Sequence, residues 1–228
     1  IFDDESLKIS KKLNLNAYKI ASSDLTDLNL IKKISKLKKP IILSTGMGSK
    51  TEIAKVLKIL KKNKIYLLHC VSMYPCPKDF VNLKRMTFLK KMHDNVGYSD
   101  HSLGVHASLL AISMGAKILE KHFTINKNNI GADHILSADP KDLKIICDFA
   151  LNYKKILGSG NIEPSIKEKK MRKFFRKSIY ASRKISRGEK INETNIKSMR
   201  PQSHIKSEEF YKILGKKVKK NIKTYEPI

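Results

Sequence analysis

The sequence predicts an α/β fold built on parallel strands, followed by a second, small domain of different character. Short runs rich in Ile, Val, Leu and Tyr alternate with stretches of helical periodicity along the first 158 residues. Each strand-and-helix pair has about the length of a βα unit, which favours a parallel sheet covered by helices. The alternation stops at "GSGN", residues 158–161, and short β-like segments begin at Ser178.

Five apolar runs bounded by small or polar residues are expected to form buried strands. These runs are "AYKIAS" at 17–22, "PIILST" at 40–45, "IYLLHC" at 65–70, "VGYSD" at 96–100 and "KILEKHF" at 117–123. Helices are expected at 27–37, 50–62, 83–92, 104–114 and 140–157. We therefore predict a parallel α/β domain over 1–158, a charged linker over 159–177 and a small β-rich domain over 178–228, including "SIYASRKI" and "GKKVKKNI".

The charge balance leaves two classes of function open. Lys and Arg number 47 against 21 Asp and Glu, a formal net charge of +26. The cations are spread along nearly every segment, which fits a small anionic substrate. The densest run, "KEKKMRKFF" at 167–175, keeps open a non-catalytic basic module that binds nucleic acid or an anionic glycan. Nucleic acid is disfavoured because the only interleaved aromatic residues are Phe174 and Phe175.

The remaining composition predicts a cytoplasmic chain with no membrane segment. No apolar run approaches the roughly 18 residues that a spanning helix needs. The first residues, "IFDDESLKIS", carry acidic groups where a secretory signal has basic ones. The three cysteines are odd in number and irregularly spaced, so reduced thiols are expected rather than a disulfide framework or a four-ligand zinc site.

Polar side chains lie at or just after the carboxyl ends of all five predicted strands. In a (β/α)₈ barrel the active site lies at the carboxyl ends of the strands, so these residues are candidate site residues. One such residue alone is usually a cap or a satisfied core group, whereas five strands in succession indicate a site. The residues are Lys19, Ser22, Ser23 and Asp24; Ser44 and Thr45; His69, Cys70 and Ser72; Ser99, Asp100 and His101; Glu120, Lys121 and His122.

Two histidines in this set lie one strand-helix-strand step apart. His101 and His122 are therefore expected on adjacent strands, with Asp100, Glu120 and Asp133 nearby. Two imidazoles and carboxylates suit a divalent ion such as Mn²⁺ or Zn²⁺, with water in the open positions. Such an ion could polarise a substrate carbonyl. Two histidines that only hydrogen-bond in the core explain the spacing equally well.

A second group carries donors without negative charge. Lys19 with the hydroxyls of Ser22, Ser44 and Ser99 supplies what a phosphate or carboxylate requires. Ordinary capping of the strand ends is the alternative explanation.

The ordered runs resemble a known family. "AYKIASSDL", "KPIILSTGM", "LLHCVSMYPCP", "GYSDHS", "LEKHFT" and "GADH" resemble the barrel domain of the N-acylneuraminate synthases, which make sialic, legionaminic and pseudaminic acids. The tail, "RKSIYASRKISRGEKI", is similar to their C-terminal SAF, or antifreeze-like, domain. The resemblance implies an incomplete (β/α)₈ TIM barrel, with about five of eight βα units, before a truncated SAF domain. It implies a fragment that is inactive alone.

The resemblance also implies a reaction and partners. Such enzymes condense phosphoenolpyruvate with an N-acylated hexosamine, here N-acetylmannosamine or a legionaminic-type precursor, to give a nonulosonic acid and phosphate. They need a divalent metal, for which Mn²⁺ is expected first and Mg²⁺ or Co²⁺ are alternatives. A domain-swapped homodimer is expected.

Individual roles follow from matching motifs. His101 and His122 match metal ligands, and Lys19, Ser22, Ser44 and Ser99 match groups that hold phosphoenolpyruvate. The sugar is expected to face Asp24, Tyr74, Asp133 and Arg200, the last supplied by the partner subunit's SAF domain. The expected catalytic groups are Asp24, Asp133 and Lys19. Two departures stand out: Asp24 replaces a frequent glutamate, and "RPQSHI" lacks both glycines of the usual "RPGxGI" turn beside Arg200.

Overall fold

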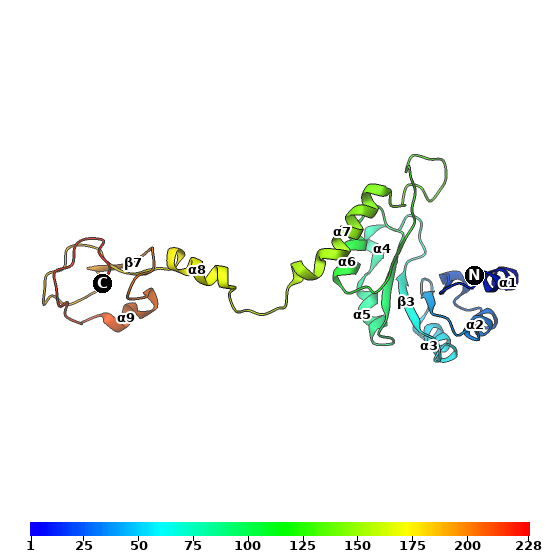
Figure 1. Ribbon diagram of the computed structural model, residues 1–228, viewed down its shortest axis with the longest axis horizontal. Helices are drawn as coiled ribbons and strands as arrows, with labels where there is room; N and C mark the ends of the chain where they lie inside the picture. Colours follow the sequence, from blue (N-terminus) through cyan, green and yellow to red (C-terminus); the bar gives the residue numbers. More distant parts are fainter. The chain divides into compact units, whose positions relative to one another are not determined.

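The computed structural model describes residues 1–228, which form two compact units, Ile1–Gly158 and Ser159–Ile228 (Figure 1). The first unit contains α1 (Asp4–Lys12), β1 (Tyr18–Ile20), η1 (Ser22–Asp24), α2 (Leu28–Ser35), β2 (Ile41–Ser44), α3 (Lys50–Ile59), β3 (Ile65–Cys70), α4 (Lys78–Val81), α5 (Lys84–Lys90), β4 (Val96–Asp100), α6 (His106–Ser113), β5 (Leu119–Lys121) and α7 (Pro140–Leu157). The second contains α8 (Ile166–Phe175), β6 (Ser178–Ala181), β7 (Ile196–Met199), η2 (Ser207–Glu209) and α9 (Phe210–Ile213).

The first unit is built on one parallel sheet with strand order β1-β2-β3-β4-β5. Every neighbouring pair is parallel, as between β2 and β3, where Ile41 lies opposite Ile65. A helix follows each strand and returns the chain to the start of the next one, as a βαβ crossover requires. The five predicted strands and the parallel arrangement are confirmed.

The sheet is strongly curved. Lys19 on β1 and Glu120 on β5 form an ion pair with Nζ and Oε2 3.5 Å apart, although these are the two outermost strands. In a flat sheet, four steps of about 4.8 Å would separate the strands by roughly 19 Å, more than the two side chains reach together. The five strands therefore form a half-barrel, consistent with part of a (β/α)₈ barrel.

The two faces of the sheet have different chemistry. The helix face buries the apolar core with α2, α3, α5 and α6, and its strand residues are Tyr18, Ile20, Ile41, Leu43, Ile65, Leu67, Val96 and Tyr98. Because side chains alternate, the residues between them point to the inner, concave face. The register places Lys19, Ser44, Ser99 and Glu120 on that inner face.

The same alternation corrects the expectation for Asp100. It was expected beside the two histidines, but it follows inward-facing Ser99 and therefore points to the helix face, where it is 0% exposed. Its carboxylate accepts hydrogen bonds from Ser102 and Ser108 and pairs with Lys121 at 3.1 Å. Asp100 and Lys121 hold the β4 and β5 ends against α6 and are not part of a metal shell.

His69 also points away from the inner face. Its Nε2–H donates to the Val81 carbonyl at 2.7 Å, and its ring stacks on Tyr98. Burial, with a smaller contribution from the Arg85 charge, lowers the pKa of His69 below its ordinary value of 6.5, although the bond to Val81 opposes this shift.

That shift predicts a pH dependence of stability. Because the pKa of His69 is lower in the folded state, the unfolded chain binds the proton more tightly. The contribution of His69 to the free energy of unfolding is therefore fully present above pH 6.5 and is lost as the pH falls through the folded-state pKa. We expect His69→Gln, which keeps a donor for Val81, to flatten the loss of unfolding free energy between about pH 6.5 and 5. Urea unfolding at several pH values measures this, with the exposed His106→Gln as control. An unchanged slope in His69→Gln would contradict it.

The second unit is a small β-rich body. Strands β6 and β7 pair antiparallel, with Ser178 opposite Met199. The core consists of Ile179, Ala181, Ile185, Ile191, Ile196, Ile213, Val218 and Ile222. The expected strand at "GKKVKKNI" is present only as the isolated bridges Ile185–Ile222 and Lys190–Lys217, because the chain turns between these contacts instead of running alongside a partner.

Four helices were not predicted from the sequence: α1, α4, α8 and α9. Helix α1 begins with a capping box between Asp3 and Ser6, and α8 begins with one between Ser165 and Glu168. Helix α8 lies within the segment expected to be a charged linker. It has no buried residue, and most of its residues are charged, so the segment was assigned by its charge rather than as a helix. No helix combines the length and hydropathy needed to cross a bilayer.

Candidate functional site

The inner face carries a polar cluster at the carboxyl ends of the strands, here called the strand-end site. Its residues are Lys19, Ser22, Asp24, Ser44, Tyr74, Ser99, His101, Glu120, His122 and Asp133. Glu120 connects two of the predicted anion-binding residues: it accepts a hydrogen bond from Ser99 Oγ at 2.7 Å and pairs with Lys19 at 3.5 Å. A carboxylate thus already lies between the donors that were predicted to hold a substrate anion.

Two buried oxygens near the carboxyl ends of β1 and β2 have no hydrogen-bond partner. They are Asp24 Oδ2 and Ser44 Oγ, the only buried side-chain nitrogen or oxygen atoms of the chain without one. Burial of an unpaired polar group costs free energy, so such atoms usually mark a water, an ion or a ligand. Both residues were singled out from the sequence as substrate-binding groups.

Ser22 lies at the start of η1, next to Ser44. Its hydroxyl accepts a hydrogen bond from the Gly46 backbone N–H at 3.0 Å, which ties the β1–α2 connection to the β2–α3 loop. A side chain at Gly46 would meet Ser22 Oγ and Ser72 Oγ at under 3 Å, so only glycine lets the two loops approach this closely.

The two predicted metal-binding histidines meet in the structure. The ring centroids of His101 and His122 are 5.4 Å apart, and the Tyr74 ring lies 4.1 Å from His101 and 5.9 Å from His122. Burial, with smaller effects from the charges of nearby Cys70, Asp133 and Glu120, raises the pKa of Tyr74, so its hydroxyl stays protonated as a donor.

The surroundings of His101 suit a metal ligand. Its Nδ1–H donates to the Val71 carbonyl at 2.8 Å, which fixes the tautomer and leaves Nε2 with a free lone pair. His122 Nδ1 lies 3.4 Å from Asp133 Oδ2, a carboxylate of the loop before α7. No group of three or more His, Cys, Asp or Glu side chains has metal-binding geometry, so the chain offers two nitrogen ligands and leaves the other positions open.

The predicted sugar-facing residues are only partly brought together. Tyr74 and Asp133 lie beside the histidine pair, and a cavity of about 300 Å³ is lined by His122, Asp133 and His134 among others. Arg200 belongs to the second unit, where its Nε–H donates to the Phe175 carbonyl at 2.6 Å. Its predicted role toward a partner subunit therefore stays a prediction.

Sequence reasoning gave Glu120 no role beyond that of a nearby carboxylate. The alternation rule would have found its place, because Glu120 and His122 are two residues apart at the same strand end and so point to the same face. The Val71 carbonyl, which orients His101, could not be found from the sequence because any residue supplies a carbonyl.

Comparison with known proteins defines the class to which this strand-end site belongs. The NeuB family model matches residues 1–162, and the SAF domain model matches residues 176–228. The chain belongs to the NeuB family and carries a SAF domain at its C-terminal end. Several of its relatives are synthases of nonulosonic acids, the group that includes sialic, legionaminic and pseudaminic acids.

Two relatives illustrate the match. N,N'-diacetyllegionaminic acid synthase of Campylobacter jejuni is 42% identical over 233 residues, covering 100% of this chain and 70% of that protein. Pseudaminic acid synthase of the same organism is 38% identical over 226 residues, covering 97% of this chain and 66% of that protein. The chain thus spans about two thirds of the length of the curated relatives it matches.

A solved structure gives the same result. The N-acetylneuraminic acid (sialic acid) synthetase of Leptospira borgpetersenii, crystallised in complex with citrate, is 37% identical and superposes with a TM-score of 0.69. The match covers 74% of this chain and 60% of that one.

Proposed function

We propose that the protein condenses phosphoenolpyruvate with the open-chain aldehyde of an N-acylated hexosamine to give a nonulosonic acid and phosphate. The observation that carries the proposal is the strand-end site, which holds a lysine and a serine hydroxyl around one carboxylate, two unpaired buried oxygens and two histidines in contact. N-acetylmannosamine and a legionaminic-type precursor are the candidate sugars, since relatives are named as sialic and legionaminic acid synthases.

The reaction balances with four changes. The methylene carbon of phosphoenolpyruvate forms a bond with the aldehyde carbon, and the aldehyde oxygen takes up a proton. Water adds to the former enol carbon and loses both its protons as the carbonyl of the product forms; the bond from that carbon to the phosphate oxygen breaks, and inorganic phosphate leaves with one proton. The protein must therefore hold a trianionic substrate, orient an aldehyde against it and exchange protons at two oxygens.

The anion is assigned to Lys19 with the hydroxyls of Ser22, Ser44 and Ser99. Ser44 Oγ is buried and free of partners, ready to donate to a substrate oxygen. Lys19 and Ser99 are held by the Glu120 carboxylate, which supports the assignment because it shows that their donors converge on one anionic group. Substrate binding then requires Glu120 to move aside.

The sugar is assigned to Asp24, Tyr74 and Asp133, with Arg200 contributed by the SAF domain of the partner subunit in a domain-swapped dimer. Asp24 and Asp133 are the candidates for proton transfer at the aldehyde oxygen and at water. A divalent ion held by His101 and His122, Mn²⁺ before Mg²⁺ or Co²⁺, would supply Lewis-acid activation of the aldehyde.

The direct test is phosphate release from phosphoenolpyruvate with Mn²⁺ and either candidate sugar. Strands β1 and β5 have no partner on their outer sides, and open edges leave the interior exposed to water. We therefore expect turnover when a segment that extends the sheet is supplied with this chain, and none from the 228 residues alone. Phosphate release that needs neither sugar nor metal would contradict the proposal.

Ser44→Ala separates the effect of the unpaired hydroxyl on stability from its effect on substrate binding. In the absence of substrate we expect the free energy of unfolding to stay the same or rise by about 1 kcal/mol, since a buried orphan oxygen is removed. Phosphoenolpyruvate binding should weaken roughly tenfold, because a donor to a charged group is lost. Urea unfolding and calorimetric titration measure the two effects.

The matched control is Ser35→Ala, a half-buried serine at the end of α2 in the same unit. It should leave phosphoenolpyruvate affinity unchanged. A clear loss of stability in Ser44→Ala with unchanged affinity would show that this hydroxyl is structural.

A further inference from the structure

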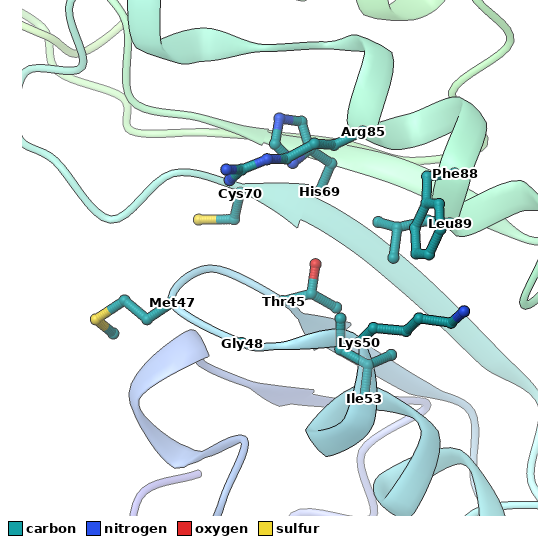
Figure 2. Close-up of a pocket in the computed structure, with 10 residues that line it drawn as sticks. All are labelled: Thr45, Met47, Gly48, Lys50, Ile53, His69, Cys70, Arg85, Phe88 and Leu89. Atoms are coloured by element: carbon teal, nitrogen blue, oxygen red, sulfur yellow. The ribbon is translucent and has the colours of Figure 1, made fainter.

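A second cavity lies outside the strand-end site, where β2 and β3 lead into their helices. Its volume is about 330 Å³. Figure 2 shows the residues that line it: Thr45, Met47, Gly48, Lys50, Ile53, His69, Cys70, Arg85, Phe88 and Leu89. Strands β2 and β3 are paired on both edges, so this pocket needs no further strand for its completion.

The pocket carries positive charge that nothing in the chain neutralises. Lys50 and Arg85 line it, no carboxylate does, and neither cation forms an ion pair. In Figure 2 the Arg85 guanidinium lies over His69 and Cys70, while the Lys50 chain runs along the opposite wall. Thr45 lies between them in this view, and its hydroxyl donates to the Leu68 carbonyl at 2.9 Å.

The rest of the wall is apolar. Ile53, Phe88 and Leu89 contribute a hydrophobic surface, and Phe88 remains 42% exposed. The Lys50 ammonium lies 5.6 Å from the Phe88 ring centroid, so one cation is already held near the apolar side. A cationic group beside an exposed aromatic wall matches a ligand with an anionic end and an apolar body.

We propose that this pocket binds a small organic anion, in which one carboxylate or phosphate group is joined to an apolar ring or short chain. The anionic end lies against Arg85, and the apolar part lies on Phe88 and Leu89. The volume is at the lower end of the roughly 300–1,000 Å³ typical of ligand pockets, which limits the body to about one ring.

The site is distinct from the strand-end site but shares a loop with it. Ser44 points to the inner face, whereas the next residue, Thr45, lines this pocket. Gly46 contacts Ser22 at the strand-end site, whereas Met47 again lines the pocket. A ligand here would therefore touch the loop that carries Ser44.

The test uses phenyl phosphate and benzoate as probes, with ligand-observed NMR on the full chain. Inorganic phosphate lacks the apolar part and benzyl alcohol lacks the charge, so both should bind more weakly than the amphiphilic anions. We expect Arg85→Ala to weaken binding of the anionic probes about tenfold or more, since a charged hydrogen bond is lost. Lys84→Ala, an exposed lysine next to it on α5, should stay within about twofold, as expected for a charge with no direct contact.

A second variant and a competitor complete the test. Phe88→Ser should weaken the binding of phenyl phosphate but leave the binding of inorganic phosphate unchanged. The side chains of Arg85 and Phe88 are both exposed, so both variants should fold. Excess phosphoenolpyruvate should not displace the probe. Equal binding by wild type and Arg85→Ala, or no saturable binding of either anionic probe, would overturn the proposal. So would displacement by phosphoenolpyruvate together with weaker binding in Ser44→Ala, because the probe would then occupy the strand-end site.

Discussion

Replacing His101 with alanine is expected to weaken Mn²⁺ binding by at least about 100-fold and to abolish metal-dependent condensation. Loss of an outer-sphere partner of a metal ligand typically costs 10- to 100-fold in affinity, and His101 is one of only two nitrogen ligands that the structure brings together. The Nδ1–H of His101 already donates to the Val71 carbonyl, and no protein group bonds to Nε2. The substitution therefore removes a nitrogen lone pair that is free to bind a metal.

Isothermal titration of Mn²⁺ into the folded chain measures this loss. His106→Ala is the matched control, since His106 is an exposed histidine at the start of α6 and should leave the affinity unchanged. Because His101 is buried, its variant could lose stability, so His122→Ala serves as a second probe at a side chain that is 33% exposed. Undiminished Mn²⁺ affinity in both histidine variants would remove the metal site from the proposed function.

The strands were predictable because each is a short apolar run ended by polar residues. Side chains from β1, β4 and β5 meet at their carboxyl ends, as the Lys19–Glu120 and Ser99–Glu120 contacts show, and the site assigned there stays a prediction. Polarity alone, however, does not give the direction of a side chain. Asp100 and His69 carry the right chemistry and face the helices, whereas Glu120 faces the site.

Other features depend on contacts that no local pattern records. The approach of Lys19 to Glu120 follows from the curvature of the whole sheet, to which every strand contributes. Helix α8 has capping residues and no buried face, so only its backbone bonds define it. The pocket beside Arg85 arises where α5 packs near the β2–α3 loop, two segments separated in the sequence by β3.

The largest effect on stability is expected from Asp100→Ala, with a loss of about 3–5 kcal/mol in the free energy of unfolding of the first unit. The carboxylate is 0% exposed, and the side chain of its partner Lys121 is 5% exposed. The variant leaves a buried ammonium without its counter-charge, and it leaves the Ser102 N–H and the Ser108 hydroxyl without their acceptor.

Removal of both charges should cost less than removal of Asp100 alone. In Asp100→Ala/Lys121→Met no buried charge remains unpaired, so we expect this double variant to be more stable than Asp100→Ala alone. The difference from the sum of the two single variants gives the coupling energy between the two sites. Hydrogen exchange of peptides from β3 and β4 reports unfolding of the first unit without contribution from the second. Asp94→Ala, an exposed aspartate in the turn before β4, should stay within about 0.5 kcal/mol of wild type. A loss of less than about 1 kcal/mol in Asp100→Ala would contradict this prediction. It would mean that the Asp100–Lys121 pair does not hold the ends of β4 and β5 against α6, and that Asp100 does not stabilise the strand that carries Ser99.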